Sequence, residues 1–323
     1  MVRIATIGTN FVHDMFMDGA TQVPACEVAC ACSRSEENAR RVADKWGIPR
    51  ICLSQDELAA DPTIDAVWIA TPNKFHLEHA KKFLAAGKHV LLEKPAVTSM
   101  ADFRELMAAR DASGRVLMEA MRPVHGPYVP LLRELIAGIG PVRRVRFALE
   151  AFSSRYQAFR EGTIQNAFNP ALQNSSMLDM GCYVISMCVA LFGAPTSVQA
   201  HSVFLHNGFE GEGSLTLGYD GMIANLTYSK VASAFSGSEI VGEDGSIWID
   251  KIDIPHVIRV RHRGSDEVQE IYDPLGQHSM QFEVEDFCRA VAGELDLAPY
   301  LQISEDAMAV MDEVIRQVGI TFE

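Results

Sequence analysis

The sequence has no excess of basic residues, no signal peptide and no long apolar run. Its 323 residues contain 28 lysines and arginines against 42 aspartates and glutamates, a formal net charge of −14. Nucleic acids and anionic membranes attract basic surfaces, so this balance argues against both as partners. No stretch approaches the roughly 18 apolar residues that a membrane span needs, and the chain opens directly on a strand-like run. These absences predict a cytoplasmic protein.

Cysteine pairs at metal-ligand spacing are also missing. The seven cysteines are odd in number, and most lie in apolar surroundings. We therefore interpret them as reduced core residues in a reducing compartment. Cys30 and Cys32 alternate along a predicted strand and would share one face, so a redox pair is the alternative interpretation for these two. No cluster of histidine, aspartate or glutamate has ligand spacing either, and no metal site is predicted.

The composition is that of an ordinary globular protein, with 48% hydrophobic and 22% charged residues, and the length allows about two domains. Strand and helix patterns alternate from residue 1 to residue 121, which predicts an α/β Rossmann domain with a doubly wound parallel sheet. Residues 122–323 are predicted to form an α+β domain for substrate binding and oligomerisation. Stretches that alternate between apolar and polar residues from Pro141 onward predict a large, mostly antiparallel open sheet with one face packed on helices.

A glycine turn follows the first predicted strand, Val2–Ile7, and precedes a predicted helix over Phe11–Gly19. This arrangement opens a dinucleotide-binding unit, in which the helix N-terminus offers backbone N–H groups to a pyrophosphate. A complete G-x-G-x-x-G would have glycines at positions 8, 10 and 13, where the chain has Gly8, Asn10 and His13. Asparagine tolerates a left-handed turn, whereas His13 either caps the helix, contacts phosphate or crowds the helix–strand contact. The predicted cofactor contacts here are Gly8, Thr9, Asn10 and Phe11.

The second predicted strand, Glu27–Cys32, ends in Ser33 and Arg34. An acidic residue at that position would accept hydrogen bonds from the adenosine ribose of NAD, and it is absent. A hydroxyl beside a guanidinium suits the 2′-phosphate of NADP. NADP is therefore the predicted cofactor, with NAD as the alternative. Ser33 is also a candidate helix cap, which is compatible with phosphate binding.

Two loops follow buried strands at the edge of the sheet where ligands bind in open α/β folds. The first is Thr71–Asn73, and His76 lies in the first turn of the helix after it, as either a packing residue or a cofactor contact. The second is Glu93–Pro95, where the lysine can point at a bound cofactor or simply form a solvated pair with the glutamate. The predicted cofactor contacts at this edge are Thr71, Pro72, Asn73, His76, Glu93, Lys94 and Pro95.

Asp179 and Tyr183 are four residues apart on a helix predicted over residues 175–192, so both side chains project from one face. A phenol becomes a usable proton donor if an adjacent ammonium lowers its pKa, and Lys94 is the candidate ammonium. The alternative for Tyr183 is an aromatic residue that packs the helix. Further polar residues are candidates for a substrate pocket, each with a structural role as its alternative: Glu119, Arg122, His125, Arg155 and His278.

Together these motifs resemble the glucose-fructose oxidoreductase, inositol dehydrogenase and rhizopine-catabolism (Gfo/Idh/MocA) family of NAD(P)-dependent oxidoreductases. The matching segments are Gly8 after its strand, Ser33–Arg34, Thr71–Asn73 with His76, Glu93–Pro95 and Asp179–Tyr183. The resemblance covers nearly the whole chain. It implies a cis peptide before Pro95, Lys94 facing the nicotinamide, and a dimer or tetramer formed through the open sheet face.

Many relatives carry histidine where this chain has Tyr183, and the tyrosine is similar to that of dimeric dihydrodiol and NADP-dependent xylose dehydrogenases. The resemblance therefore implies hydride transfer between NADP(H) and a hydroxyl or carbonyl carbon of a sugar, polyol or cyclic diol, with Lys94, Asp179 and Tyr183 as catalytic residues. The chain departs from the family at Asn10 and His13, and it lacks paired glycines over residues 166–176. These departures motivate the alternative of a catalytically inactive nucleotide-binding regulatory or partner protein.

Overall fold

The computed structural model describes residues 1–274 and 280–322. The chain forms two compact units. The first contains Met1–Arg122 and a later segment that ends at Gln302, and the second contains the stretch that begins at Pro123 and the one that begins at Ile303. The division into functional domains at residue 121 stays a prediction, and the compact units differ from it because a late segment returns to the first unit.

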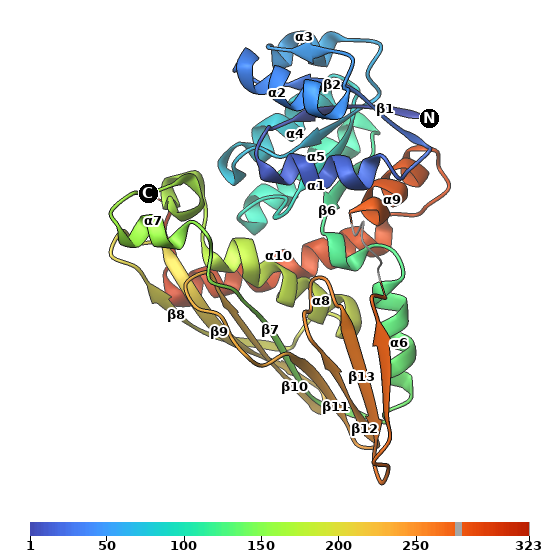
Figure 1. Cartoon of the computed structure of the whole chain (residues 1–323), viewed down its shortest axis with the longest axis vertical. Helices are drawn as coiled ribbons and strands as arrows, with labels where there is room; N and C mark the ends of the chain where they lie inside the picture. The colour runs from blue at the N-terminus through green and yellow to red at the C-terminus, as the bar shows by residue number, and fades with distance from the viewer. Residues whose placement is uncertain (275–279, 323) are drawn as a thin grey trace. The chain divides into compact units, whose positions relative to one another are not determined.

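The first unit is built on six parallel strands in the order β3-β2-β1-β4-β5-β6 (Figure 1). This is the strand order of a Rossmann fold, so the predicted α/β class is confirmed. Its ligand-binding edge is the one at the carboxyl ends of the strands. The strands are β1 Val2–Ile7, β2 Cys26–Cys32, β3 Ile51–Cys52, β4 Ala66–Ile69, β5 His89–Glu93 and β6 Leu117–Ala120.

Serine side chains cap three helices of this unit, and the helix that begins at Glu36 is capped by Ser35 and not by the candidate Ser33. Each hydroxyl accepts a backbone N–H from the first turn: Ser35 from Asn38 at 3.3 Å, Ser54 from Glu57 at 3.3 Å and Ser99 from Asp102 at 3.1 Å. A capped N-terminus satisfies donors that the helix itself leaves unpaired. The helices are α1 Phe11–Ala20, α2 Glu36–Trp46, α3 Gln55–Ala60, the 3₁₀ turn η1 Asn73–Phe75, α4 His76–Ala85 and α5 Met100–Ser113.

The returning segment contributes α9, Gln281–Val291, to the same core. Helix α9 packs on α1, where a Cβ at Gly19 would lie 2.7 Å from the backbone nitrogen of Gln281. The glycine therefore allows close approach of the two helices. Phe16 of α1 stacks on Trp68 of β4 with ring centroids 4.2 Å apart, and Phe287 of α9 belongs to the same apolar cluster.

The second unit is built on eight strands in the order β14-β13-β12-β11-β7-β10-β9-β8. All neighbours are antiparallel except β7 and β10, which run parallel. The expected large, mostly antiparallel sheet is therefore confirmed. The strands are β7 Val142–Glu150, β8 Ser197–Phe204, β9 Glu210–Tyr219, β10 Met222–Ser229, β11 Ser238–Gly242, β12 Gly245–Ile249, β13 Val257–His262 and β14 Val268–Tyr272.

Side chains alternate between buried and exposed along the central strands, as the sequence pattern predicts. Val145 of β7 is buried between two exposed arginines, Phe147 is buried as well, and Ile223 of β10 is exposed between buried neighbours. Helix α8, Cys182–Phe192, packs on β7 and β10, so it covers the buried face of the sheet (Figure 1). The other helical segments are η2 Arg122–Val124, α6 Tyr128–Ala137, α7 Tyr156–Arg160, η3 Asn166–Phe168, η4 Pro170–Leu172, the π-helical turn η5 Met177–Gly181 and α10 Ala298–Val318.

All seven cysteines are free thiols, five of them buried and Cys26 and Cys52 half-buried. Burial raises the pKa of the Cys32 and Cys188 thiols to about 12, which keeps both protonated and unreactive. Among the helices of the described residues, none combines the length and the apolar character needed to cross a membrane.

Candidate functional site

The turn between β1 and α1 depends on Gly8. Its φ is +127°, and a Cβ there would lie 2.5 Å from the carbonyl oxygen of Ala70, at the end of β4. Asn10 is not left-handed as the sequence suggested: its φ of −83° and ψ of −174° are extended, and its side chain accepts the backbone N–H of Val12 at 3.1 Å. Asn10 therefore caps α1, and the turn keeps its helix N-terminus without a second glycine.

His13 is a buried residue of the first unit. Its Nε2 lies 3.0 Å from the hydroxyl of Thr6, and its ring meets Trp68 edge to face with centroids 6.0 Å apart. Burial lowers the pKa of His13 to about 4, so the ring is neutral at physiological pH. Of the three sequence interpretations, only packing between helix and strand agrees with this position.

One guanidinium contacts the turn, and the sequence did not single it out. Ser33 follows β2 and its hydroxyl accepts the backbone N–H of Ser35 at 3.2 Å, while Arg34 beside it is exposed. Arg41 of α2 donates from Nη2 to the carbonyl oxygen of Thr9 in the turn itself. Arg34 precedes the N-cap of α2, so no helical spacing relates it to Arg41 and no local signal in the sequence identifies Arg41.

His76 joins the two predicted cofactor loops. Its Nε2 lies 2.7 Å from the carbonyl oxygen of Thr71, its Nδ1 lies 3.0 Å from that of Pro95, and the side chain is buried. Burial lowers the pKa of His76, and the two carbonyls oppose that shift. Asn73 lies in η1, and the N-cap position of α4 is Phe75. His76 holds the loop together with the contact of Thr71 Oγ1 with His79 Nδ1 at 3.2 Å.

Lys94 follows the last residue of β5 at the carboxyl edge of the first sheet and is half-buried. The Lys94–Pro95 peptide is cis, as the resemblance implied. The loop after it is held by Glu119, whose Oε1 accepts the backbone N–H of Ala96 at 2.8 Å. Glu119 was a substrate candidate, and the structure gives it this structural hydrogen bond.

Behind Lys94, two carboxyl groups and a guanidinium are buried together in the first unit. Burial raises the pKa of Glu93 to about 7, against the opposing charges of Lys94 and Arg122. Burial also raises the pKa of Glu283 of α9 well above its usual range, and the charge of Glu93 adds to that shift. Arg122, another substrate candidate, is buried and lowers the pKa of both carboxyls. Glu283 was not predicted, because nothing in the local sequence indicates that α9 returns to this core.

Asp179 and Tyr183 lie in the second unit on consecutive helical segments. The predicted helix over residues 175–192 is divided: Met177–Gly181 forms the π turn η5, and α8 begins at Cys182. From Gly181 to Ala190 every residue except Tyr183 is buried, so the tyrosine is the side chain that leaves the packed face. Single π turns within helices are frequent at functional sites.

Lys230, which the sequence analysis did not single out, pairs with Asp179. Its Nζ lies 2.6 Å from Asp179 Oδ2, with side-chain exposures of 6% for the lysine and 41% for the aspartate. The ammonium follows the last residue of β10 and is buried among aromatic rings. A buried ammonium beside it favours the ionised form of a carboxyl group.

The π turn is anchored from below by a buried carboxyl group on β9. Glu210 accepts the backbone N–H of Met177 at 2.8 Å and the hydroxyl of Ser202 at 3.1 Å. A Cβ at Gly181 would lie 2.8 Å from the ring of Tyr228, so glycine permits the turn to rest on that ring. These contacts set the position of the segment that carries Asp179.

The remaining substrate candidates differ in accessibility. His125 is buried, and Arg155 is half-buried just before α7, where its backbone N–H donates to Ser153 Oγ at 3.3 Å. His278 lies outside the described residues. Of the three catalytic candidates, Lys94 lies in the first unit and Asp179 and Tyr183 lie in the second.

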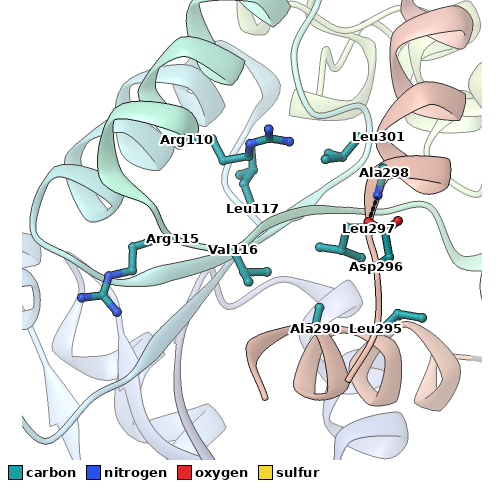
Figure 2. A pocket seen from close by; sticks show the side chains of 10 residues that line it. All are labelled: Arg110, Arg115, Val116, Leu117, Ala290, Leu295, Asp296, Leu297, Ala298 and Leu301. Atoms are coloured by element: carbon teal, nitrogen blue, oxygen red, sulfur yellow. Dashed lines mark hydrogen bonds between the residues drawn. The ribbon is translucent and has the colours of Figure 1, made fainter. Parts of the chain in front are cut away.

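A pocket of about 300 Å³ lies at the opposite edge of the first sheet from Lys94, where β6 begins (Figure 2). Val116 and Leu117 line it together with the segment between α9 and α10, and Arg110 and Arg115 flank it. Arg110 is paired with Asp111 at 2.6 Å. None of the predicted site residues lines this pocket, so it is separate from the candidate site.

Comparison with known proteins identifies both halves of the chain. Residues 2–121 match the model of the oxidoreductase family with an NAD-binding Rossmann fold, and residues 131–248 match that of the GFO/IDH/MocA C-terminal domain. The chain is 38% identical to scyllo-inositol 2-dehydrogenase (NADP(+)) of Bacillus subtilis over 325 residues, which cover 100% of this chain and 98% of the relative.

Two further similarities extend over most of the chain. It is 30% identical to D-xylose 1-dehydrogenase (NADP(+)) 2 of Haloferax volcanii, with 88% of this chain and 87% of the relative covered. The solved structure of a levoglucosan dehydrogenase in complex with NADH and levoglucosan has a TM-score of 0.87 at 20% identity, with 98% of this chain and 97% of that chain covered. The latter similarity concerns the fold alone. The full-length identity and the two domain matches show that the chain belongs to the Gfo/Idh/MocA family of oxidoreductases.

Proposed function

We propose that the protein transfers hydride between NADP(H) and a hydroxyl or carbonyl carbon of a sugar, polyol or cyclic diol. The observation that carries this proposal is the 38% identity, over the full length, to an NADP-dependent scyllo-inositol dehydrogenase. The D-xylose dehydrogenase relative also acts on a polyhydroxy substrate and also uses NADP. Both relatives support the substrate class rather than a particular substrate.

The residues around the first turn fit NADP. Gly8 brings backbone close to the end of β4, and the N-terminus of α1 is suited to a pyrophosphate. Arg34 and Arg41 supply positive charge for phosphate groups, with Ser33 as a hydroxyl donor. No acidic residue stands at the end of β2 to bind the ribose of NAD. When bound, the nicotinamide supplies the hydride chemistry.

The chain's own residues would handle the proton and the substrate. In the oxidative direction Tyr183 removes the hydroxyl proton, and Lys94 stabilises the alkoxide that forms. Lys94 would also favour the phenolate of Tyr183 by its charge, and Lys94 itself is the alternative proton acceptor. Asp179 accepts a hydrogen bond from a substrate hydroxyl, for which its exposed carboxylate is suited.

The test begins with calorimetric titration of the purified protein with NADPH and with NADH. We expect NADPH to bind clearly more tightly, followed by turnover in a screen that starts with scyllo-inositol and D-xylose and NADP⁺. Lys94→Ala should reduce kcat about 10²- to 10⁴-fold with NADPH affinity retained. The control is Lys251→Ala, since Lys251 is exposed and remote in sequence from the proposed site residues. Wild-type turnover in Lys94→Ala, or no binding of either nucleotide, would refute the proposal.

The alternative of an inactive regulatory protein rested on Asn10, on His13 and on the lack of paired glycines over residues 166–176. Asn10 caps α1 and His13 is buried, so neither side chain blocks the turn. The relatives named above are described as dehydrogenases. We therefore retain the enzyme as the proposal.

The outer face of the second sheet is the expected site of self-association, as a dimer or tetramer. Ile223 of β10 and Val203 of β8 are more than half exposed, and apolar side chains that gather on one face favour protein contacts. Sedimentation velocity checks this, because a monomer at micromolar concentration contradicts it. The expected compartment is the cytoplasm, in keeping with seven free thiols; fractionation of cells tests it.

A further inference from the structure

Lys230 is more deeply buried than the carboxylate with which it pairs. Its side chain is 6% exposed, whereas that of Asp179 is 41% exposed, although Nζ and Oδ2 are 2.6 Å apart. Lysine is almost never fully buried unless its charge is paired. In this pair the ammonium of Lys230 is buried, and the carboxylate of Asp179 remains accessible.

The same ammonium holds a second segment. Nζ donates to the carbonyl oxygen of Ala167 at 3.0 Å and lies over the rings of Phe168 at 5.1 Å and Phe209 at 5.5 Å. Ala167 and Phe168 belong to η3, within the stretch where the chain lacks the paired glycines of its relatives. One cation thus connects the end of β10, the turn η3 and the π turn that carries Asp179.

The aromatic surroundings make this pair strong and specific in its geometry. Phe168 and Phe209 exclude water from one side of the ammonium, and an ion pair is stronger where the effective dielectric is low. A carboxylate fixed by such a partner loses rotamer freedom before any substrate arrives. Such preorganisation lowers the entropy lost on substrate binding, and it therefore increases affinity and the rate of reaction.

We propose that Lys230 is a positioning residue of the active site, which holds Asp179 ionised and oriented toward substrate hydroxyls and fixes η3 against it. The proposal rests on the proposed function, in which Asp179 binds the substrate. Because Lys230 is buried, it acts through Asp179 and not by touching the substrate. The shape of the 166–172 stretch and the position of the carboxylate are then set together.

The test is a double-mutant cycle with Lys230→Met and Asp179→Asn, assayed with a substrate that the wild-type enzyme turns over. Each single variant should reduce kcat/KM about 10- to 100-fold, mainly through a higher KM. Asp179→Asn weakens the contact with the bound substrate directly, and Lys230→Met weakens it by releasing Asp179. The double variant should be no worse than Asp179→Asn alone. Lys230→Arg, which keeps the charge, should recover most of the loss. NADPH affinity should be unchanged throughout, because the proposed cofactor residues lie in the first unit.

The control is Lys251→Met, which removes an exposed charge from the same unit and should leave KM unchanged. Losses that add in the double variant, or a wild-type KM in Lys230→Met, would overturn the role of Lys230. If Lys230→Met does not fold, Lys230→Gln replaces it, since the amide keeps a donor for Ala167 and removes the charge. The same rise in KM is then required.

The cycle also separates this proposal from the proposed function. If the wild-type protein turns over no substrate, the proposed function has failed. The pair is then tested by melting temperatures, which should fall less in the double variant than the sum of the two single variants. Additive melting shifts would show that the two residues do not interact and would overturn the proposal on their own.

Discussion

Gly8 is a residue whose missing side chain decides whether the first turn forms. A Cβ at this position would have to displace backbone, since it would lie 2.5 Å from the carbonyl oxygen of Ala70. Backbone cannot yield as a flexible side chain can. The positive φ of +127° adds a second obstacle for any L-residue.

We therefore predict that Gly8→Ala weakens NADPH binding by about tenfold or more, because strain of about 1–3 kcal/mol is placed in the turn that approaches the cofactor. Gly47→Ala is the matched control. Gly47 also has a positive φ, +67°, but no atom lies within 4 Å of its Cβ position. Gly47→Ala should lower the free energy of unfolding by about 1–2 kcal/mol. It should leave the affinity for NADPH at the wild-type value. Calorimetric titration checks both variants, and equal affinities for the two would contradict the argument.

For single residues, the sequence predicted the kind of chemistry better than the degree of burial. Asn10 lies in the turn after β1, as its position in the sequence indicates, but its role as an extended cap depends on ψ, which residue type does not determine. His13 and His76 were ambiguous because a histidine in the first helical turn has the same local sequence whether it faces solvent or the core. Lys230 was missed because its partner is 51 positions away in the chain (230 − 179). Its proposed role in positioning Asp179 depends on that contact.

At the scale of elements, β5 and α9 bring together two buried carboxyl groups. Ionising both at once costs free energy. The folded-state pKa of Glu93 is raised from 4.5 to about 7 by burial, and burial also raises that of Glu283. Since both values lie above those of the unfolded chain, the protonated forms contribute stability that is complete below about pH 4.5. That contribution is lost as the pH rises through about 7.

Glu283→Gln should therefore reduce the loss of folding stability that accompanies a rise in pH. We expect the wild-type free energy of unfolding to fall by on the order of 1–3 kcal/mol between pH 5.5 and 8 from this pair, and the variant to lose clearly less. Glu285→Gln is the matched control, because Glu285 is exposed on the same helix and should retain the wild-type slope. Urea titrations at several pH values measure this, and identical slopes for Glu283→Gln and the wild type would refute it.

Helices and strands with strong local signals were predicted closely. Ser54 and Ser99 stand directly before the helices that they cap, because a cap is decided within four residues. For α2 the cap is Ser35 and not the candidate Ser33, because both serines precede the helix. The π turn at Met177–Gly181 was not predicted, since it is imposed by Glu210 and Tyr228 from the sheet below. The parallel pairing of β7 with β10 likewise has no local signal, because the strands are separated by more than 70 positions.

At the scale of the whole molecule, the first unit is completed by residues from the far end of the chain. The motifs at Gly8, Glu93 and Asp179 predicted the family and the two architectures, since each has a fixed spacing. They contained nothing about α9, whose apolar side matches α1 only once both helices are folded.

A chain that ends at Arg122 should therefore be an incomplete nucleotide-binding unit. Without α9, apolar residues of α1 and β4, including Phe16 and Trp68, lose part of their cover. We expect such a chain to melt at lower temperature or aggregate, and a chain in which residues 280–302 follow Arg122 through a short flexible linker to regain solubility and NADPH binding. Equal stability of the two chains would show that α9 is dispensable.

The position of α9 late in the chain also delays the folding of the first unit during synthesis. A ribosome adds about 5–20 residues per second, so the helix that covers α1 leaves the exit tunnel on the order of ten seconds or more after α1 itself. During that interval the nascent chain presents an unfinished apolar surface, which is what chaperones at the ribosome bind. The nucleotide-binding unit, although encoded first, is therefore expected to mature among the last parts of the protein.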